Sequence, residues 1–309
     1  MPLLSVVVAT WNRPERLDEA LRSVALQGAD VPFEVIVVND GGVDIGHVVA
    51  RWARLMPVES VNLEANAGLA RARNEGIRRA RGDILCFLDD DDVMLAGHLR
   101  AGAERIRGDV DAVCARVAVC DQFVAAGSAP SASQVKAHYG ATFDDRLLMV
   151  CNFIPVNALF IRRRAGMAIA FDERLPQLED WDLWLRLRHR FGCRFETLPL
   201  TTAVYHRVPG FGSMTSRSHQ SADAALLFRD TFREIVSRYP THDPIIREGR
   251  ALHDHFYAAV ARARRNGEHV HPFAYERFVD CMATFISGAP AAELAPERID
   301  RLINAPVTS

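Results

Sequence analysis

Four consecutive aspartates, at positions 89 to 92, directly follow the apolar residues 84–88. Adjacent unit charges about 6 Å apart repel by roughly 3 kcal/mol at an effective dielectric constant of about 20, so a cation is expected beside them. Carboxylate oxygens favour Mg²⁺ or Mn²⁺, which usually takes one or two protein carboxylates and completes its shell with water and substrate phosphates. The aspartates therefore indicate a site for a metal-bound diphosphate. A solvated acidic turn before a helix near residues 96–106 is the alternative, because acids also stabilise the start of a helix.

A second group of acids, Glu179, Asp180 and Asp182, precedes a segment whose apolar residues repeat at helical spacing. A carboxylate held there could act as a general base, which typically contributes about 10² to 10⁴ in rate. Asp180 is our candidate for that base. The structural alternative is that acids are simply favoured in the first turn of a helix.

Residues 205–207 read Tyr-His-Arg and precede a glycine-rich segment at 210–215. Such a segment is suited to a lid that orders over a diphosphate. His206 could complete a metal shell or contact phosphate, and Arg207 could neutralise a leaving group, although a lone histidine is more often structural. Residues 152–157 could line an acceptor site, and a strand edge explains them equally well.

Short apolar runs at residues 3–9, 33–38, 58–63 and 84–88 predict four β-strands. Helical spacing, proline and glycine signals place helices between them: one after Pro14, one at 48–55 and one at 67–80. Continuous apolar strands that alternate with helices imply a mostly parallel sheet covered on both faces. The predicted fold class is therefore α/β, with a Rossmann-like sheet flanked by helices.

Polar residues follow three of these strands, and in such sheets ligands bind beyond the carboxyl ends of the strands. Thr10, Trp11 and Asn12 follow the first strand, the Asn-Asp-Gly-Gly sequence at 39–42 follows the second, and the four aspartates follow the fourth. Turn formation explains each group alone but explains the aspartates poorly. A ligand site is expected at this edge of the sheet.

The chain beyond residue 110 shows weaker patterns. Alternating apolar residues at 113–119 predict a half-exposed strand, and the small and polar residues at 125–140 predict a flexible loop. Helical patterns at 222–238, 245–266 and 273–287 predict a carboxyl-terminal helical region. We predict a catalytic domain over residues 1–215 and the helical region over residues 216–309.

Five segments occur in order: Val-Val-Val-Ala-Thr-Trp-Asn-Arg at 6–13, Glu-Val-Ile-Val-Val-Asn-Asp-Gly at 34–41, Gly-Leu-Ala-Arg-Ala-Arg-Asn at 68–74, Phe-Leu-Asp-Asp-Asp-Asp at 87–92 and Glu-Asp-Trp-Asp-Leu at 179–183. Through them, residues 3–215 resemble an inverting family-2 glycosyltransferase of the GT-A fold. The resemblance implies transfer of a sugar from a UDP-, GDP- or dTDP-sugar to a hydroxyl acceptor, with Mn²⁺ or Mg²⁺ as cofactor, in polysaccharide, glycolipid or other glycoconjugate biosynthesis. It leaves the base, the sugar and the acceptor open.

The same resemblance implies roles for individual residues. Thr10, Asn12 and Asp40 are expected to hold the base and ribose, and Asp89 to contact ribose or the donor sugar. The implied donor-binding residues are Thr10, Asn12, Arg13, Asp40, Arg73, Asp89 and Asp90. The implied metal ligands are Asp91, Asp92 and His206, with Asp91 foremost, and the implied base is Asp180. Asn39 departs from the family, which often has an acid there, and the acid at Asp90 leaves open which carboxylates meet the ion.

Composition argues against several other classes of protein. The 309 residues are 49% hydrophobic and can bury a large core, while a net charge of −2 argues against a nucleic-acid partner. The six cysteines form no C-x-x-C pair and the amino terminus reads as a buried strand, so a cytoplasmic protein without a signal peptide is expected. No segment reaches about 18 consecutive apolar residues, so only peripheral membrane contact is expected.

Other functions share part of this pattern. A sugar nucleotidyltransferase would carry a glycine-rich basic loop after the first strand, and a nicotinamide-dependent oxidoreductase would carry G-x-G-x-x-G there. This chain has Thr-Trp-Asn-Arg-Pro at that place. A sugar-nucleotide-binding or assembly protein without turnover would keep the fold, but the intact Asp91 and Asp180 argue against it.

Overall fold

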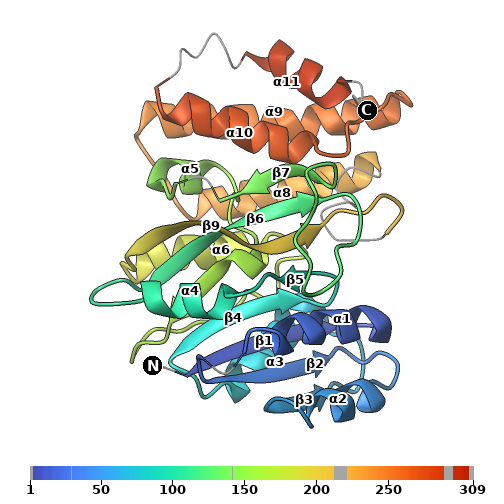
Figure 1. The fold of residues 1–309 in the computed structure, drawn as a ribbon. Helices are drawn as coiled ribbons and strands as arrows, with labels where there is room; N and C mark the ends of the chain where they lie inside the picture. Colours follow the sequence, from blue (N-terminus) through green and yellow to red (C-terminus); the bar gives the residue numbers. More distant parts are fainter. Residues whose placement is uncertain (1–2, 29, 141, 212–220, 289–294, 306–309) are drawn as a thin grey trace. The chain divides into compact units, whose positions relative to one another are not determined.

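A computed structural model describes residues 3–28, 30–140, 142–211, 221–288 and 295–305 (Figure 1). The chain divides into two compact units. The first comprises Met1–Thr142, Ile154–Arg174 and Asp182–His206, and the second comprises Phe143–Phe153, Leu175–Trp181 and Arg207–Ser309. Two short segments from the middle of the chain therefore belong with the carboxyl-terminal helices. The boundary predicted between residues 215 and 216 lies outside the described residues.

Among the described residues of the first unit, nine strands form one sheet in the order β3-β2-β1-β4-β8-β6-β9-β5, with β7 paired to β6. The first four pair in parallel: β1 (Leu4–Thr10), β2 (Phe33–Asn39), β3 (Val58–Asn62) and β4 (Ile84–Asp89). They are the four strands predicted from the apolar runs. Their order places β1 at the centre, with β2 and β4 on either side.

The second half of the sheet has mixed directions. It contains β5 (Val93–Met94), β6 (Ala112–Cys120), β7 (Val135–Tyr139), β8 (Leu159–Arg162) and β9 (Phe195–His206). Strand β8 runs antiparallel to β4 and β6, whereas β9 runs parallel to β6 and antiparallel to β5. The parallel pattern of the first half therefore stops at β4.

Two predictions for this half are wrong. Strand β6 is not half-exposed, because every one of its residues except Arg116 is buried. Ala112, Cys114, Ala118 and Cys120 have small side chains that are buried as fully as the valines, so the alternation along β6 is one of size and not of exposure. The loop expected at 125–140 contains β7, which forms because β6 offers it an edge for backbone hydrogen bonds.

Helices cover both faces of the sheet. Leu4, Val6 and Val8 of β1 share a buried core with apolar residues of α1 (Pro14–Ala25), α2 (Gly46–Trp52) and α4 (His98–Arg105). Val7 points to the opposite face, because successive residues of a strand alternate. There α3 (Leu69–Arg79) packs so closely that a Cβ on Gly76 would lie 2.3 Å from the Val7 side chain. The predicted two-sided α/β arrangement is confirmed.

The second unit is helical in the part that the structure describes. It contains α5 (Asp145–Val150), the start of α6 (Glu179–Leu185), α8 (Ala222–Ser237), α9 (Pro244–Arg265), α10 (Ala274–Ile286) and α11 (Pro296–Asn304). The helices predicted at 222–238, 245–266 and 273–287 are thus confirmed. In the first unit, α6 continues as a π-helical turn at Arg186–Arg190, and a 3₁₀ turn at Val156–Ala158 precedes β8.

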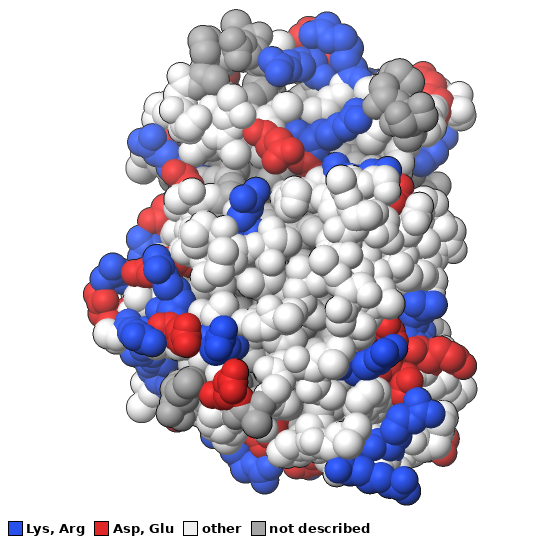
Figure 2. Space-filling model, in the orientation of Figure 1, with Lys and Arg blue, Asp and Glu red and all other residues white. Residues whose placement is uncertain are grey.

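The surface charge and the hydropathy of the helices were compared with what nucleic-acid binding and membrane crossing require. Basic and acidic side chains are interspersed on the face seen in Figure 2, and the coloured residues form no continuous positive field there. None of the described helices combines the length and the apolar character that crossing a bilayer requires.

Candidate functional site

The strand register brings the three predicted polar turns to one edge of the sheet. Thr10 at the end of β1 is paired with Asn39 at the end of β2, and Ala9 is paired with Asp89 at the end of β4. Because these strands are parallel, their carboxyl ends share that edge. The aspartate cluster (Asp89, Asp90, Asp91 and Asp92) therefore lies beside the turn that follows β1.

Asp90 and Asp91 share an arginine from that turn. The Arg13 guanidinium donates to Asp90 Oδ1 at 3.1 Å and to Asp91 Oδ2 at 3.0 Å. The Thr10 hydroxyl donates to the other oxygen of Asp90 at 2.7 Å. The positive charge that the sequence predicted beside the aspartates is thus supplied in part by the chain itself.

Asp89 is held by Arg73 of α3, whose guanidinium donates to Asp89 Oδ1 at 2.6 Å. The buried Arg73 lies 5.3 Å from the centre of the Phe171 ring. Asn74, the next residue of α3, fixes the backbone of Phe171. Its amide nitrogen donates to the Phe171 carbonyl, and its amide oxygen accepts from the Phe171 N–H. The sequence pointed to Arg73 but gave no sign that its neighbour orders Phe171.

Asp92 is fixed from both sides. Its Oδ1 accepts the backbone N–H of His206 at 2.8 Å, and its Oδ2 accepts the amide of Asn157 at 2.9 Å. The side chain is 1% exposed. The signal for Asn157 was an amide within the apolar residues 153–161, a position where a buried polar group needs a partner.

His206 at the end of β9 uses both ring nitrogens for hydrogen bonds to the backbone. Nδ1 lies 2.6 Å from the Asp91 carbonyl, which can only accept, so Nδ1 carries the proton. Nε2 accepts the Val124 N–H at 3.0 Å. Burial lowers the pKa of His206 to about 4, so the ring is neutral at pH 7. This geometry favours an orienting role over the predicted role as metal ligand.

Burial also controls the protonation of the aspartates. It raises the pKa of Asp90 to about 6, although Arg13 and Thr10 oppose the rise. Burial, with the charges of Asp90 and Asp89, raises the pKa of Asp91 to about 7, and burial raises the pKa of Asp92 well above its ordinary value. A divalent cation would favour the ionised forms, so it would bind with release of protons.

Asp91 and Asp89 have the most exposed side chains of the cluster, at 10% and 24%. Both carry oxygen donors of the kind that Mg²⁺ and Mn²⁺ prefer. Among the described residues, no three His, Cys, Asp or Glu side chains gather as a metal-ligand group, so the predicted trio of Asp91, Asp92 and His206 does not form one. The arrangement suits an ion that completes its shell with water and substrate oxygens.

Asp40 and Asn39 shape the turn after β2. Both oxygens of Asp40 accept backbone N–H groups, from Ala67 at 2.8 Å and from Gly68 at 2.9 Å, immediately before α3. Gly41 has a φ of +65°, and a Cβ there would lie 2.2 Å from the Ala65 backbone, so only glycine fits. Asn39 donates to the Val43 carbonyl at 2.9 Å. The turn is thus locked to the loop that leads into α3.

Asn12 and Trp11 occupy the turn after β1. Asn12 adopts a left-handed φ of 57°, which asparagine tolerates, and its Oδ1 accepts the Val43 N–H at 2.9 Å. Trp11 is 46% exposed. An exposed tryptophan at the carboxyl ends of buried strands offers a flat aromatic face to a ligand. The sequence placed Trp11 after the first strand, but its exposure could not be predicted from the sequence.

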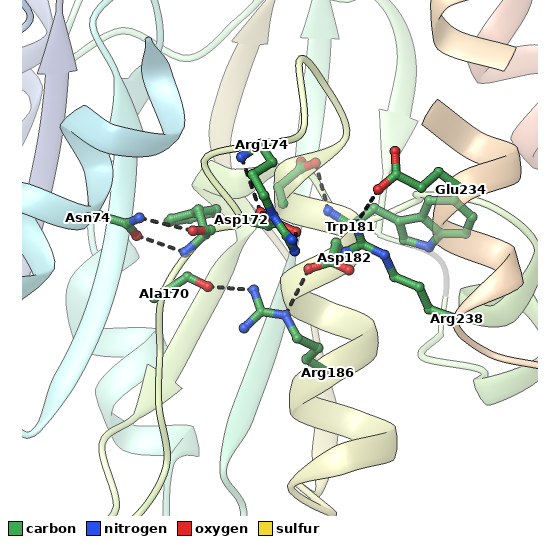
Figure 3. A network of polar contacts seen from close by, with 11 residues as sticks. Asn74, Ala170, Asp172, Arg174, Trp181, Asp182, Arg186, Glu234 and Arg238 are labelled. Atoms are coloured by element: carbon green, nitrogen blue, oxygen red, sulfur yellow. Dashed lines mark hydrogen bonds and ion pairs between the residues drawn. The ribbon is translucent and has the colours of Figure 1, made fainter. Parts of the chain in front are cut away.

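The carboxylates of the second acid group, Asp180 and Asp182, differ in burial and in hydrogen-bond partners. In the first unit, Asp182 is fully buried and pairs with Arg186 Nε at 2.8 Å, while Arg186 also reaches the Ala170 carbonyl (Figure 3). In the second unit, Asp180 is partly buried and accepts from the Asn152 amide at 3.0 Å. The preceding Leu178 has a φ of +59°, a strained value for leucine of the kind that clusters at functional sites.

Arg207 does not match its predicted role in the described structure. Its guanidinium pairs with Glu276 of α10 at 2.5 Å, and both side chains are at most 3% exposed. It also donates to the Pro272 carbonyl at 2.8 Å. Arg207 therefore forms its ion pair and this hydrogen bond within the second unit. Residues 212–215 of the predicted lid lie outside the described residues.

Comparisons with known proteins agree with this architecture. Residues 5–165 match the family described as glycosyl transferase family 2. The uncharacterized glycosyltransferase YwdF of Bacillus subtilis is 30% identical over 202 residues, which are 65% of this chain and 73% of that protein.

Two solved structures share the fold over 97% of this chain. S. aureus TarS 1-349 in complex with UDP-GlcNAc has 21% identity and a TM-score of 0.55, with 83% of its chain covered. Mannosyltransferase PcManGT from Pyrobaculum calidifontis in complex with GDP-Man and Mn²⁺ has 19% identity and a TM-score of 0.59, with 84% covered. The family match and the relative lead to one conclusion: the chain is a glycosyltransferase and belongs to glycosyl transferase family 2.

Proposed function

We propose that this glycosyltransferase uses a nucleoside-diphosphate sugar, transfers the sugar to a hydroxyl acceptor with inversion at the anomeric carbon, and requires Mn²⁺ or Mg²⁺. The observation that carries the proposal is the aspartate cluster at the end of β4, in contact with Arg13 and Arg73. It joins a carboxylate suited to a divalent ion with guanidinium groups suited to a diphosphate. The complexes of TarS with UDP-GlcNAc and of PcManGT with GDP-Man and Mn²⁺ support this class of donor and cofactor.

The donor side of the site follows from exposure and hydrogen bonding. Asp91 would hold the ion, which when bound stabilises negative charge on the departing diphosphate as a Lewis acid. Asp89, whose side chain is 24% exposed, is oriented by Arg73 and can accept from a hydroxyl of ribose or of the donor sugar. Trp11 can stack on the base, a contact typically worth about 1–3 kcal/mol. Thr10, Asn12 and Asp40 shape the base and ribose side.

The acceptor side depends on Asp180. Inversion in a single displacement requires a base that takes the proton of the acceptor hydroxyl as the new glycosidic bond forms. Of the carboxylates at the start of α6, Asp182 is fully buried, whereas Asp180 is partly exposed and accepts a hydrogen bond from the Asn152 amide. Asp180 is therefore our base, and the proton passes from the acceptor oxygen to its carboxylate.

The test is Mn²⁺-dependent release of UDP from UDP-GlcNAc or of GDP from GDP-mannose, with water as the acceptor. Asp180→Asn should lower turnover by roughly 10² to 10⁴, because the amide cannot accept the proton, and should leave donor affinity within about twofold. Asp91→Ala should instead weaken Mn²⁺-dependent donor binding, measured by titration calorimetry. Asp30→Asn, at an exposed position, is the matched control.

The outcomes separate the parts of the proposal. Binding of a nucleotide sugar without turnover by the wild-type protein would indicate a sugar-nucleotide-binding protein. Near-normal turnover in Asp180→Asn would remove Asp180 as the base. Unchanged Mn²⁺-dependent affinity in Asp91→Ala would reject Asp91 as the metal ligand.

A further inference from the structure

The carboxylate of Asp180 receives a hydrogen bond on each oxygen. Oδ1 accepts the N–H of Trp181 at 2.8 Å, and Oδ2 accepts the side-chain amide of Asn152 at 3.0 Å. An ionised carboxylate can only accept, so the amide nitrogen of Asn152, not its oxygen, must face Asp180. The orientation of the Asn152 side chain is therefore fixed by the chemistry of its partner.

The backbone that carries Asn152 is tied down by other side chains of the second unit. Asn152 lies two residues after the end of α5, and its carbonyl accepts the Tyr275 hydroxyl of α10 at 3.1 Å. The Val150 carbonyl accepts from His253 Nδ1 of α9 at 2.8 Å. The Trp181 indole donates to the Leu148 carbonyl at 2.8 Å. Three buried aromatic or imidazole rings thus hold residues 148–152 beside the start of α6.

A neutral amide is a suitable partner for a general base. Its N–H group orients a carboxylate oxygen and brings no charge of its own. Orientation matters because a small misplacement of a catalytic group can cost about 10²-fold in rate. Asn152 also differs from Asn266 of the same unit, whose amide meets Glu268 at 2.9 Å on the exposed surface.

We infer that Asn152 is a positioning residue for Asp180: it holds the carboxylate in the orientation that accepts the acceptor proton, and it contributes to turnover only through that carboxylate. The inference rests on the proposed role of Asp180 as the base. It assigns residue 152 to the catalytic base, and so goes beyond the acceptor-lining role that the sequence left open.

The test is a double-mutant cycle on donor hydrolysis, with UDP-GlcNAc or GDP-mannose, whichever the wild-type protein hydrolyses in Mn²⁺. Asn152→Ala should lower kcat roughly 10- to 100-fold, the cost expected for losing a hydrogen bond to a charged group, and should leave the donor KM within about twofold. In the Asp180→Asn background the same substitution should change kcat by less than about twofold, because no carboxylate remains to be positioned.

Two further variants keep the test decisive. Asn152→Asp has nearly the same shape but cannot donate when ionised, so it should lose kcat as Asn152→Ala does, even if the alanine variant folds poorly. Asn266→Ala removes an amide–carboxylate contact of the same kind on the surface and should keep wild-type kcat.

An equal loss in both backgrounds would show a merely structural role and overturn the inference. So would an unchanged kcat in both Asn152 variants while Asp180→Asn is inactive, a result that leaves the proposed function standing. Normal turnover in Asp180→Asn would remove the base itself, and the inference with it.

Discussion

Four adjacent aspartates of the cluster have four different environments at the scale of single residues. Asp89 pairs with Arg73, Asp90 pairs with Thr10 and Arg13, and the buried Asp92 accepts from two N–H donors. Asp91 shares Arg13, and its pKa is raised by burial and by its neighbours. The electrostatic cost of the cluster is therefore met partly by arginines and partly by protonation, and a metal ion has to compete with both.

That competition predicts a pH dependence for metal binding. The pKa of Asp91 is raised to about 7, and a carboxylate must be ionised to hold Mn²⁺. Below pH 7 a proton occupies the ligand, so the apparent Mn²⁺ affinity should fall as pH drops, by up to about tenfold per unit, and should level off above pH 7. Electron paramagnetic resonance titrations with Mn²⁺ alone between about pH 5.5 and 8 measure this. Asp91→Asn should bind Mn²⁺ more weakly than the wild type at pH 8, and an affinity independent of pH in the wild type would contradict the prediction.

At the scale of elements, strand β9 determines where His206 and Arg207 lie. Strand β9 carries His206 to the aspartate cluster, and the chain then enters the second unit, where Arg207 pairs with Glu276. The pair of Arg207 and Glu276 is buried, so loss of either side chain would destabilise the charge of the other. The pair therefore contributes to the packing of α10.

Glu276→Ala should therefore destabilise the protein by about 3–5 kcal/mol, because it leaves the Arg207 charge buried without its carboxylate. Urea unfolding followed by circular dichroism measures the change. Glu248→Ala on the exposed side of α9 is the control and should stay within about 0.5 kcal/mol of wild type. Equal stabilities of the two variants would show that the ion pair contributes nothing.

At the scale of the whole molecule, the chain divides into two compact units. Binding of the donor and the ion should stabilise the folded protein, because a ligand that binds only the folded state shifts the unfolding equilibrium. The response of the entire chain to nucleotides is therefore a measure of donor choice that needs no acceptor.

A thermal-shift series with UDP, GDP and dTDP in the presence of Mn²⁺ should show one nucleotide that raises the Tm more than the others. The expected stabilisation is about 2.7 kcal/mol at a free concentration of roughly 100 times its Kd. Asp91→Ala should lose the Mn²⁺-dependent part of the shift, and chelation of Mn²⁺ in the wild type should do the same. The absence of a shift with every nucleotide would argue against a nucleoside-diphosphate donor.

The sequence by itself determined the local features of this protein. The apolar runs gave β1 to β4, since a buried parallel strand must be apolar on both faces, and helical spacing gave α8 to α10. The turns after β1, β2 and β4 then had to share an edge, so Thr10, Arg13 and the aspartate cluster could be grouped in advance. The five family segments identified the glycosyltransferase.

Only the tertiary structure decided what depends on long-range partners. Strand β7 exists because β6 offers it an edge, and His206 meets the aspartates because β9 runs beside β6. Asn152 faces Asp180 across 28 residues of chain. The physical reason is that burial and hydrogen-bond pairing are properties of the folded neighbourhood. They give four identical aspartates different exposures and different partners, and no pattern of residue types along the chain contains that information.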